Sequence, residues 1–371
     1  MATSPPSGSF CPNPACSAYG QRNAPTLTVH STKDRRLRCR LCRKTFSQTT
    51  GTPFYRRHAD AWLMGVIVTL LAYGCPRSAI THAFALDPRT VVAWEQAAGD
   101  HAQSFHQEVV ETGHVNAQHI QADELRVRVL RGILWLAVAM DVPTRLWLGA
   151  VLRPGRDTTL LTLLFAHVQR CVAHSRYLLC VDGFGGYLRA AGQVLKQPVH
   201  TGRRGRPRLA WPDGFLLARV VKHVGGRWEG RREAVVGMLS DVLTRLSETG
   251  TNTQINTAYI ERFNATLRAR LAPLARRTRR LAGRDHHLAR HVALVGTLYN
   301  FCMPHPALTC QTADGWQVRT PAMAAGLTDH VWTTRELLTF SIITAIPLRH
   351  AREPVPFLFP TAPAEVFREA A

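Results

Sequence analysis

The stretch HIQADEL, residues 119–125, is a strand-like run that carries Asp123. A second run of this kind, YLLCVDG at residues 177–183, ends its apolar part on Asp182. Open α/β sheets place their ligands at the carboxyl ends of their strands, which is where Asp182 falls. We therefore expect both aspartates to belong to one site of an α/β domain.

The segment that contains both aspartates has a β-β-β-α-β pattern. We predict strands at residues 119–129, 133–140, 146–152 and 177–181, and a helix at 158–174. Three antiparallel strands followed by a helix and a parallel strand is the order of the ribonuclease-H-like fold, which retroviral integrases share. We predict that fold class for residues 115–305, with a further strand at 217–221 and a helix at 233–247.

Residues 259–280 are predicted to form an amphipathic helix that has one acid, Glu261, near its start and a long basic run behind it. Its apolar residues recur at helical spacing: Ile260, Phe263, Leu267, Leu271 and Leu274. A carboxylate surrounded by so many arginines suggests a metal ion held against a polyanion.

The candidate catalytic residues and Mg²⁺ ligands are Asp123, Asp182 and Glu261. Attack on a phosphodiester needs a more acidic nucleophile and a stabilised leaving oxygen, and two Mg²⁺ (or Mn²⁺) ions about 3.5–4 Å apart can supply both. Such hard cations prefer oxygen ligands. We expect Asp123 to bridge the two ions, Asp182 to hold one of them and Glu261 the other.

Three other acids are weaker candidates. Glu124 follows Asp123 directly and should face the opposite side of the strand. Asp141 precedes a turn proline and is more simply a turn residue. Asp285 lies beyond the basic run and is interpreted as a solvated charge.

The composition points to nucleic acid as the partner. The 371 residues include 46 Lys and Arg against 25 Asp and Glu, a formal charge of +21, and such a balance favours binding to phosphates. The longest apolar run, residues 62–73, is too short to span a bilayer, so we expect no membrane partner. The polar, proline-rich N-terminus does not resemble a signal peptide. An odd count of nine cysteines favours a reducing cytoplasm and a metal site over disulfides.

Two cysteine pairs near the N-terminus predict a zinc ribbon over residues 1–55. Cys11 and Cys16 form the first pair, and Cys39 and Cys42 form the second. Two such pairs on facing turns can present four thiolates to one tetrahedral Zn²⁺, whose binding would supply most of the folding free energy of so small a module.

Residues 56–110 are predicted to form a helix-turn-helix, with the recognition helix starting at Thr90 and capped by Asp87 or Pro88. A helical connector without DNA contact is the alternative. The polar residues from 100 to about 116 are interpreted as a linker or a helix that leads into the next domain. Residues 198–235 are predicted to be an inserted basic loop that either enters a minor groove or lies solvated on the surface. A C-terminal tail covers 306–371.

Thirteen residues are candidates for contact with DNA, because they lie in these basic segments or on the predicted helices. They are Arg43, Lys44, Arg77, Arg89, Thr90, Arg203, Arg204, Arg206, Arg262, Asn264, Arg268, Arg276 and Arg277.

Taken together, these motifs resemble the DDE transposases of bacterial insertion sequences, most closely the insertion-sequence-one type. The resemblance covers roughly residues 10–335 and rests on the cysteine pairs followed by RKTFSQTTGTPF (43–54), on Asp123-Glu124, VDG (181–183) and IERFN (260–264), and on YNF (299–301) with His305 and TPAM (320–323). It implies that Asp123, Asp182 and Glu261 are the catalytic triad. It also implies an enzyme that cuts transposon ends and joins their 3′ hydroxyls to target DNA in the bacterial cytoplasm, at the nucleoid. Synapsis of two ends implies at least a homodimer.

Two other functions stay open at this point. One is a domesticated, sequence-specific DNA-binding regulator that uses the ribbon and the helix-turn-helix without catalysis. The other is a ribonuclease-H-like nuclease or resolvase, which would cut DNA without joining 3′ ends.

Overall fold

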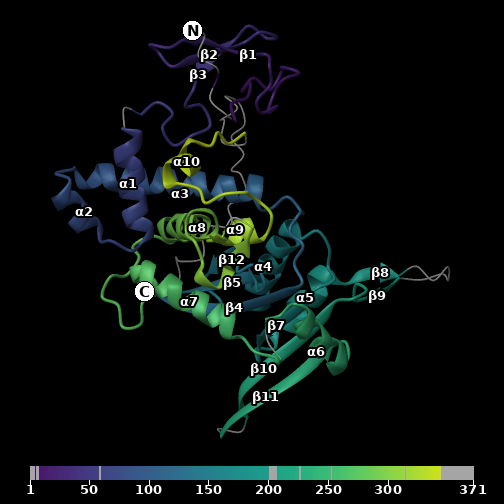
Figure 1. Ribbon diagram of the computed structural model, residues 1–371. Helices are drawn as coiled ribbons and strands as arrows, with labels where there is room; N and C mark the ends of the chain where they lie inside the picture. The colour runs from purple at the N-terminus through teal and green to yellow at the C-terminus, as the bar shows by residue number, and fades with distance from the viewer. Residues whose placement is uncertain are drawn as a thin grey trace. The chain divides into compact units, whose positions relative to one another are not determined.

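The computed structural model describes residues 5, 8–57, 60–199, 207–224, 227–251, 253–313 and 315–343. They divide into two compact units. One unit runs to Glu108 and takes in the residues from Trp332 onward, and the other spans Val109 to Val331 (Figure 1). The ribbon and the helices behind it, which we expected as separate domains, thus belong to one unit. The predicted tail is divided between the two.

The first unit begins with a small three-stranded sheet. Strand β2 (Arg36–Cys39) pairs antiparallel with both β1 (Leu27–Ser31) and β3 (Thr45–Ser47). Its buried cluster consists of three cysteines with Ala18 and Leu27, and Cys42 and Phe46 pack against it. A core this small buries little apolar surface, so the cysteines themselves form most of its centre.

Three helices follow in the same unit: α1 (Ala61–Ala72), α2 (Arg77–Ala83) and α3 (Pro88–Val109). Proline is well tolerated at the first position of a helix, and the Asp87 carboxylate accepts the N–H of Arg89 at 2.7 Å, so α3 begins at Pro88 rather than at the predicted Thr90. The polar segment after residue 100 is the second half of this helix.

The C-terminal part of the unit packs on these helices. Helix α10 (Thr334–Thr339) contacts α1, where the Thr69 and Thr334 hydroxyls are 2.7 Å apart. Beyond it, the N–H of Ile342 donates to the Gly51 carbonyl at 2.8 Å. A Cβ on Gly51 would lie 2.6 Å from the Ile342 carbonyl oxygen, and φ is +79° there, so only glycine fits this approach.

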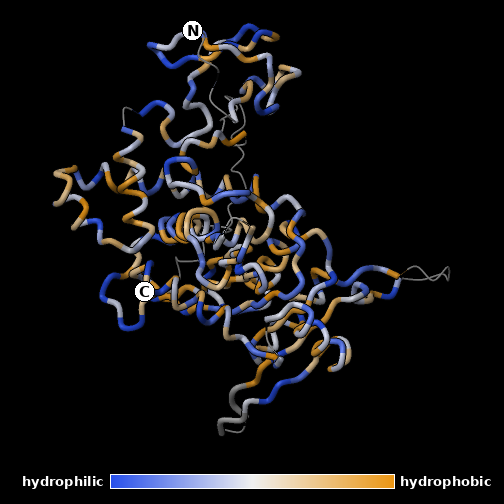
Figure 2. The backbone as a smooth tube through the Cα atoms, in the orientation of Figure 1, coloured by the Kyte–Doolittle hydropathy of each residue, from blue (hydrophilic) through white to orange (hydrophobic). Residues whose placement is uncertain are grey.

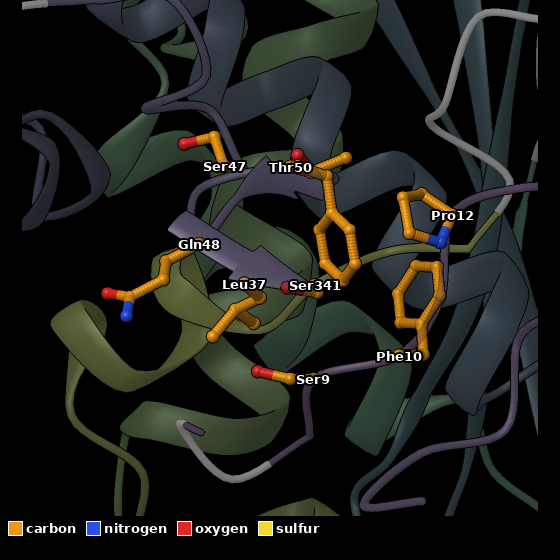
Figure 3. Close-up of a pocket in the computed structure, with 9 residues that line it drawn as sticks. Ser9, Phe10, Pro12, Leu37, Ser47, Gln48, Thr50 and Ser341 are labelled. Carbon is orange, nitrogen blue, oxygen red and sulfur yellow. The ribbon is translucent and has the colours of Figure 1, made fainter. Parts of the chain in front are cut away.

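A small pocket lies where this C-terminal segment meets the ribbon. Figure 3 shows Ser341 among Phe10, Pro12 and Leu37. Its volume of about 10 Å³ is about the minimum for one water molecule, so it is a packing gap rather than a ligand site.

The second unit is built on a six-stranded mixed sheet in the order β11-β10-β7-β4-β5-β6. Strands β4 (His119–Val129), β5 (Gly132–Asp141) and β6 (Trp147–Arg153) form an antiparallel meander. Helix α4 (Thr158–Cys171), capped by Asp157, leads to β7 (Leu178–Asp182), which pairs parallel with β4. The four strands and the helix predicted for this segment are all present.

The predicted loop at 198–235 is wrong for most of its length, although the strand predicted at 217–221 is confirmed. It contains a short hairpin, β8 (Gln197–Val199) with β9 (Arg208–Ala210), and then two long strands, β10 (Leu216–Val224) and β11 (Arg227–Val236). β10 pairs parallel with β7 and so extends the main sheet (Figure 1). The helix expected from residue 233 is α6 (Leu239–Glu248), because Glu233 lies in β11. Backbone pairing with β10 holds β11 in the sheet although its side chains are largely polar (Figure 2).

The remaining helices of this unit pack on the sheet or on a neighbouring helix. They are α5 (Gly186–Leu195), α7 (Ala258–Arg270), α8 (Asp285–Cys302) and α9 (Pro321–Ala324), with the small hairpin β12 (Cys310–Thr312) and β13 (Gly315–Gln317) before α9. Helix α8 lies close to β6, because Gly296 has no Cβ to collide with the Trp147 ring. The Asn300 side chain bonds both the N–H and the carbonyl of Trp147 at 2.9 Å. In the described part of the chain, no helix is long and apolar enough to cross a membrane.

Candidate metal centres

The four ribbon cysteines form one cluster. Their sulfur atoms all lie within 4.8 Å of one another, with 3.6 Å between Cys11 and Cys42 and 3.8 Å between Cys16 and Cys39. A Zn–S bond of about 2.3 Å in a tetrahedron puts the sulfurs about 3.8 Å apart. All four thiols are free rather than disulfide-bonded. The cluster therefore has the donor atoms and the spacing that a structural zinc ion requires.

The surroundings of Cys42 favour the thiolate. Burial raises the pKa of its thiol, but hydrogen bonds from the Lys44 backbone, the Asn13 side chain and neighbouring thiols lower it to about 7. Zinc binds thiolates, so a pKa close to neutrality suits a metal ligand.

The strand register brings Asp123 and Asp182 together. His119, Ile120 and Gln121 of β4 pair in parallel with Leu178, Leu179 and Cys180 of β7. Asp123 lies two residues beyond Gln121, and Asp182 lies two residues beyond Cys180, the last pair between these two strands. Paired residues of the two strands are 59 positions apart (178 − 119), and the same 59 positions separate the two aspartates (182 − 123). Parallel strands in register carry such residues to one edge of the sheet, as we predicted.

Glu124 joins these aspartates, although the sequence analysis set it aside. It does alternate away from Asp123 and toward Tyr187 of α5, whose hydroxyl affects its pKa. Even so, carboxylate oxygens of Asp123, Glu124 and Asp182 all lie within 4.8 Å of one another. The Glu124 side chain is fully buried. We call these three residues the acidic cluster.

Arg156 bridges two members of the cluster. Its guanidinium lies 3.1 Å from Asp182 and 3.3 Å from Glu124, above the rings of Phe184 and Trp135. This residue was not a candidate from the sequence, since it comes from the loop before α4. Arg153 and Arg156 both stand at the end of the third strand, so the sequence alone did not single out Arg156.

The acidic cluster has more negative charge than its partners neutralise. Burial raises the pKa of Glu124 to about 7, and the charge of Asp182 raises it while Arg156 lowers it. Burial also raises the pKa of Asp123, as do the charges of Asp182 and Glu261, against hydrogen bonds from the Glu124 N–H and Asn264. Closely spaced carboxylates of this kind are the donor set that Mg²⁺ or Mn²⁺ prefers. The residues present could hold a divalent cation.

Glu261 lies near the cluster without joining it. Within the described residues, it is not among the acids whose oxygens gather within 4.8 Å. Its Oε1 accepts a hydrogen bond from the Thr257 hydroxyl at 2.8 Å, and its charge acts on Asp123. Asn264 and Arg268 share its face of α7, and both act on Asp123 as well.

The Gln121 side chain forms hydrogen bonds that join the start of α7 to β4, the strand that carries Asp123. Its Oε1 accepts the N–H groups of Tyr259 and Ile260 at 3.1 and 3.0 Å, and its Nε2 donates to the Asn256 carbonyl at 2.8 Å. The side chain is fully buried. It satisfies two amides at the helix start, where no helix carbonyl can reach them. This role was not predicted from the sequence, although a glutamine two residues before a candidate ligand was a signal.

The candidate DNA contacts fall into different surroundings. Arg43, Lys44, Arg89, Arg262, Arg276 and Arg277 are exposed, while Thr90 and Arg268 are half-buried. Arg77 forms an ion pair with buried Glu95 at 2.5 Å. Asn264 is only 1% exposed and bonds Asp123, so the DNA contact predicted for it is wrong in this structure. Arg203, Arg204 and Arg206 lie outside the described residues.

Comparisons with known proteins add no name to these sites. No protein-family model matches the chain, and a search of curated proteins also found no match. The mixed α/β sheet, the four-cysteine cluster and the acidic cluster therefore carry the functional inference.

Proposed function

We propose that this chain is a metal-dependent DNA transposase of the DDE type, whose second unit is a ribonuclease-H-like catalytic domain. The observation that carries the proposal is the parallel pairing of β4 with β7, which brings Asp123 and Asp182 to one sheet edge. The order of the five strands β6-β5-β4-β7-β10, with β10 parallel to β7, supports the fold assignment. A third acid, Glu261, approaches the pair from α7.

In the proposed mechanism, Asp123 and Asp182 would hold divalent cations at the sheet edge, and Glu261 would complete the ligand set. When bound, two such ions would make the attacking water or 3′ hydroxyl more acidic and stabilise the leaving oxygen. The protein itself supplies position. Gln121 holds the start of α7 against β4, and Asn264 orients the Asp123 carboxylate through a hydrogen bond of 2.7 Å.

Positive side chains near the acids would meet the DNA phosphates. Arg268 lies on the acid-facing side of α7, close enough to Asp123 for their charges to interact. Arg156 now neutralises Asp182 and Glu124, and a guanidinium at this place could turn to a phosphate oxygen once a cation binds the acids. The exposed Arg89 at the start of α3 supports an end-binding role for the first unit.

The test is cleavage and joining on DNA that carries the gene's own flanking ends, in Mg²⁺ or Mn²⁺. We expect joined products from the wild type and none from Asp123→Asn, Asp182→Asn or Glu261→Gln, while all bind DNA equally. Asp285→Asn, which removes an exposed acid at the start of α8, is the matched control and should stay active.

Other outcomes point elsewhere. Loss of activity in Glu124→Gln but not in Glu261→Gln would replace Glu261 by Glu124 as the third ligand. Cutting without 3′-end joining would favour a nuclease or resolvase. Binding without any product in the wild type would favour a DNA-binding regulator.

A further inference from the structure

A cavity of about 230 Å³ lies in the second unit, against the face of α7 that points away from Glu261. Arg262 and Arg270 line it from α7, and Arg145 lines it from the turn between β5 and β6. Tyr299 and His305, from the end of α8 and the segment after it, contribute to its wall. Among the residues that the structure describes, no Asp or Glu lines this cavity.

The three arginines make the cavity strongly positive. Burial lowers the pKa of His305, and the charges of Arg145 and Arg262 lower it further. Burial raises the pKa of the Tyr299 hydroxyl, whereas Arg145 and Arg270 act in the opposite direction. The neutral histidine and the phenol are thus hydrogen-bonding groups in a pocket whose fixed charge is entirely positive.

Two of the three arginines are also held in place. The Arg145 guanidinium lies 4.1 Å from the centre of the Tyr259 ring and donates to the Val142 carbonyl. Arg270 donates to the sulfur of Met303. Guanidinium groups that are fixed by other contacts lose little side-chain freedom when an anion binds, which favours binding.

The cavity is separate from the acidic cluster. Arg270 follows Glu261 by nine positions, which at about 3.6 residues per turn is two and a half turns, so the two side chains leave opposite sides of α7. A group bound here is therefore not the one that reacts at the acids.

We propose that this cavity binds one phosphate group of a nucleic-acid strand, at a point away from the reacting phosphate. This inference rests on the proposed function, because the DNA substrate of a transposase would provide the strand. The formal charge of +21 favours binding of such a strand. The volume lies below the roughly 300–1,000 Å³ of pockets that enclose whole small molecules. It suits a phosphate with part of its sugar, while guanidinium groups provide the paired N–H donors that phosphate oxygens accept.

The test measures binding of a short fluorescent DNA duplex across a series of salt concentrations, in EDTA so that no metal-dependent step contributes. Arg262→Gln, Arg270→Gln and the double variant are compared with the wild type, and Arg189→Gln on α5 controls for loss of one exposed charge. We expect affinity to fall roughly tenfold or more. The slope of the logarithm of the binding constant against the logarithm of the salt concentration changes by about 0.9 for each phosphate contact. Because both arginines hold the same phosphate, this slope should become shallower by about 0.9 in each single variant and by no more than that in the double variant.

A second measurement separates a strand phosphate from free phosphate. Thermal stabilisation by inorganic phosphate is compared with that by chloride at equal ionic strength. If inorganic phosphate stabilises the wild type but the variants keep the wild-type salt slope for DNA, the strand assignment is overturned. Unchanged slopes and unchanged affinity in all variants would overturn it as well. Shallower slopes together with absent cleavage in the wild type would leave the cavity standing and remove the transposase function.

Discussion

Asn264 and Asp123 are 141 positions apart in the chain, yet the Asn264 side-chain amide donates a hydrogen bond of 2.7 Å to Oδ2 of Asp123. The other oxygen of that carboxylate accepts the N–H of Glu124 at 2.9 Å. Asp123 is thus oriented from both sides before any cation is bound. Groups that orient a metal ligand in this way tune the affinity of the site.

Replacing Asn264 by Ala should reduce metal-dependent cleavage by roughly 10–100-fold, since the Asp123 carboxylate would lose its orienting donor. DNA affinity should stay within a factor of about two, because the side chain is buried. Cleavage assays and fluorescence anisotropy measure the two quantities. Unchanged cleavage with weakened binding would restore Asn264 as a direct DNA contact.

Replacing Gln121 by Leu should lower the free energy of unfolding by about 2–4 kcal/mol. One buried and one part-buried amide at the start of α7 would lose their acceptor; a buried amide without a partner costs about 1–3 kcal/mol, and the part-buried one costs less. Denaturant unfolding measures the loss. Gln254→Leu, at an exposed position before the same helix, is the control and should change stability by less than about 0.5 kcal/mol.

Metal analysis of the purified protein should find about one zinc per chain, held by Cys11, Cys16, Cys39 and Cys42. Cys39→Ser should lose it and melt at a lower temperature, since metal binding contributes folding free energy to the ribbon. Cys75→Ser changes a cysteine outside the cluster and should retain the zinc. Zinc retained by Cys39→Ser would disprove a site built on these four thiols.

Substitutions at Arg77 and Arg89 should have different effects, because Arg77 has a structural role and Arg89 is a candidate for DNA binding. Arg77→Ala removes the ion pair between Arg77 and the buried Glu95 carboxylate and should cost about 1–3 kcal/mol of stability, reduced because Arg77 is 47% exposed. Arg89→Ala should leave stability unchanged and weaken DNA binding, since that side chain is 96% exposed. Thermal melts and anisotropy would show both effects, and equal stability in the two variants would contradict the assignment.

The first unit should lose stability in mild acid because of His101. Burial lowers the pKa of this histidine to about 4, while its ring Nε2 bonds the Leu337 carbonyl at 2.9 Å. The unfolded chain takes up the proton near pH 6.5 and the folded chain only near 4, so stability falls as pH drops through this window.

Between pH 7 and pH 5 this histidine should account for about 2 kcal/mol. His101→Gln should show a correspondingly smaller difference in unfolding free energy between these two pH values than the wild type. His82→Gln, at an exposed position on α2, should leave the difference unchanged. A wild-type pH dependence in His101→Gln would rule this histidine out.

Local sequence patterns predicted those features of the structure that depend on residues close together in the chain. The cysteine pairs predicted the four-thiol cluster, because each pair is a single turn. The apolar runs between residues 119 and 181 predicted the meander, the helix and the strand that carries Asp182, since these strands are buried over most of their length. The turn role of Asp141 is confirmed as well, because its carboxylate accepts hydrogen bonds from Thr144 three residues on.

Tertiary packing decided the rest. Strand β11 has a polar sequence and exists as a strand because β10 lies beside it. Glu124 joins Asp123 and Asp182, despite alternating to the other face, because the parallel register brings β7 to the same edge. By itself the sequence determined which residues are acidic, basic or thiol-bearing and how they repeat along each element. Only the tertiary structure decided which of them meet, because each meeting depends on the pairing of segments that are dozens of residues apart.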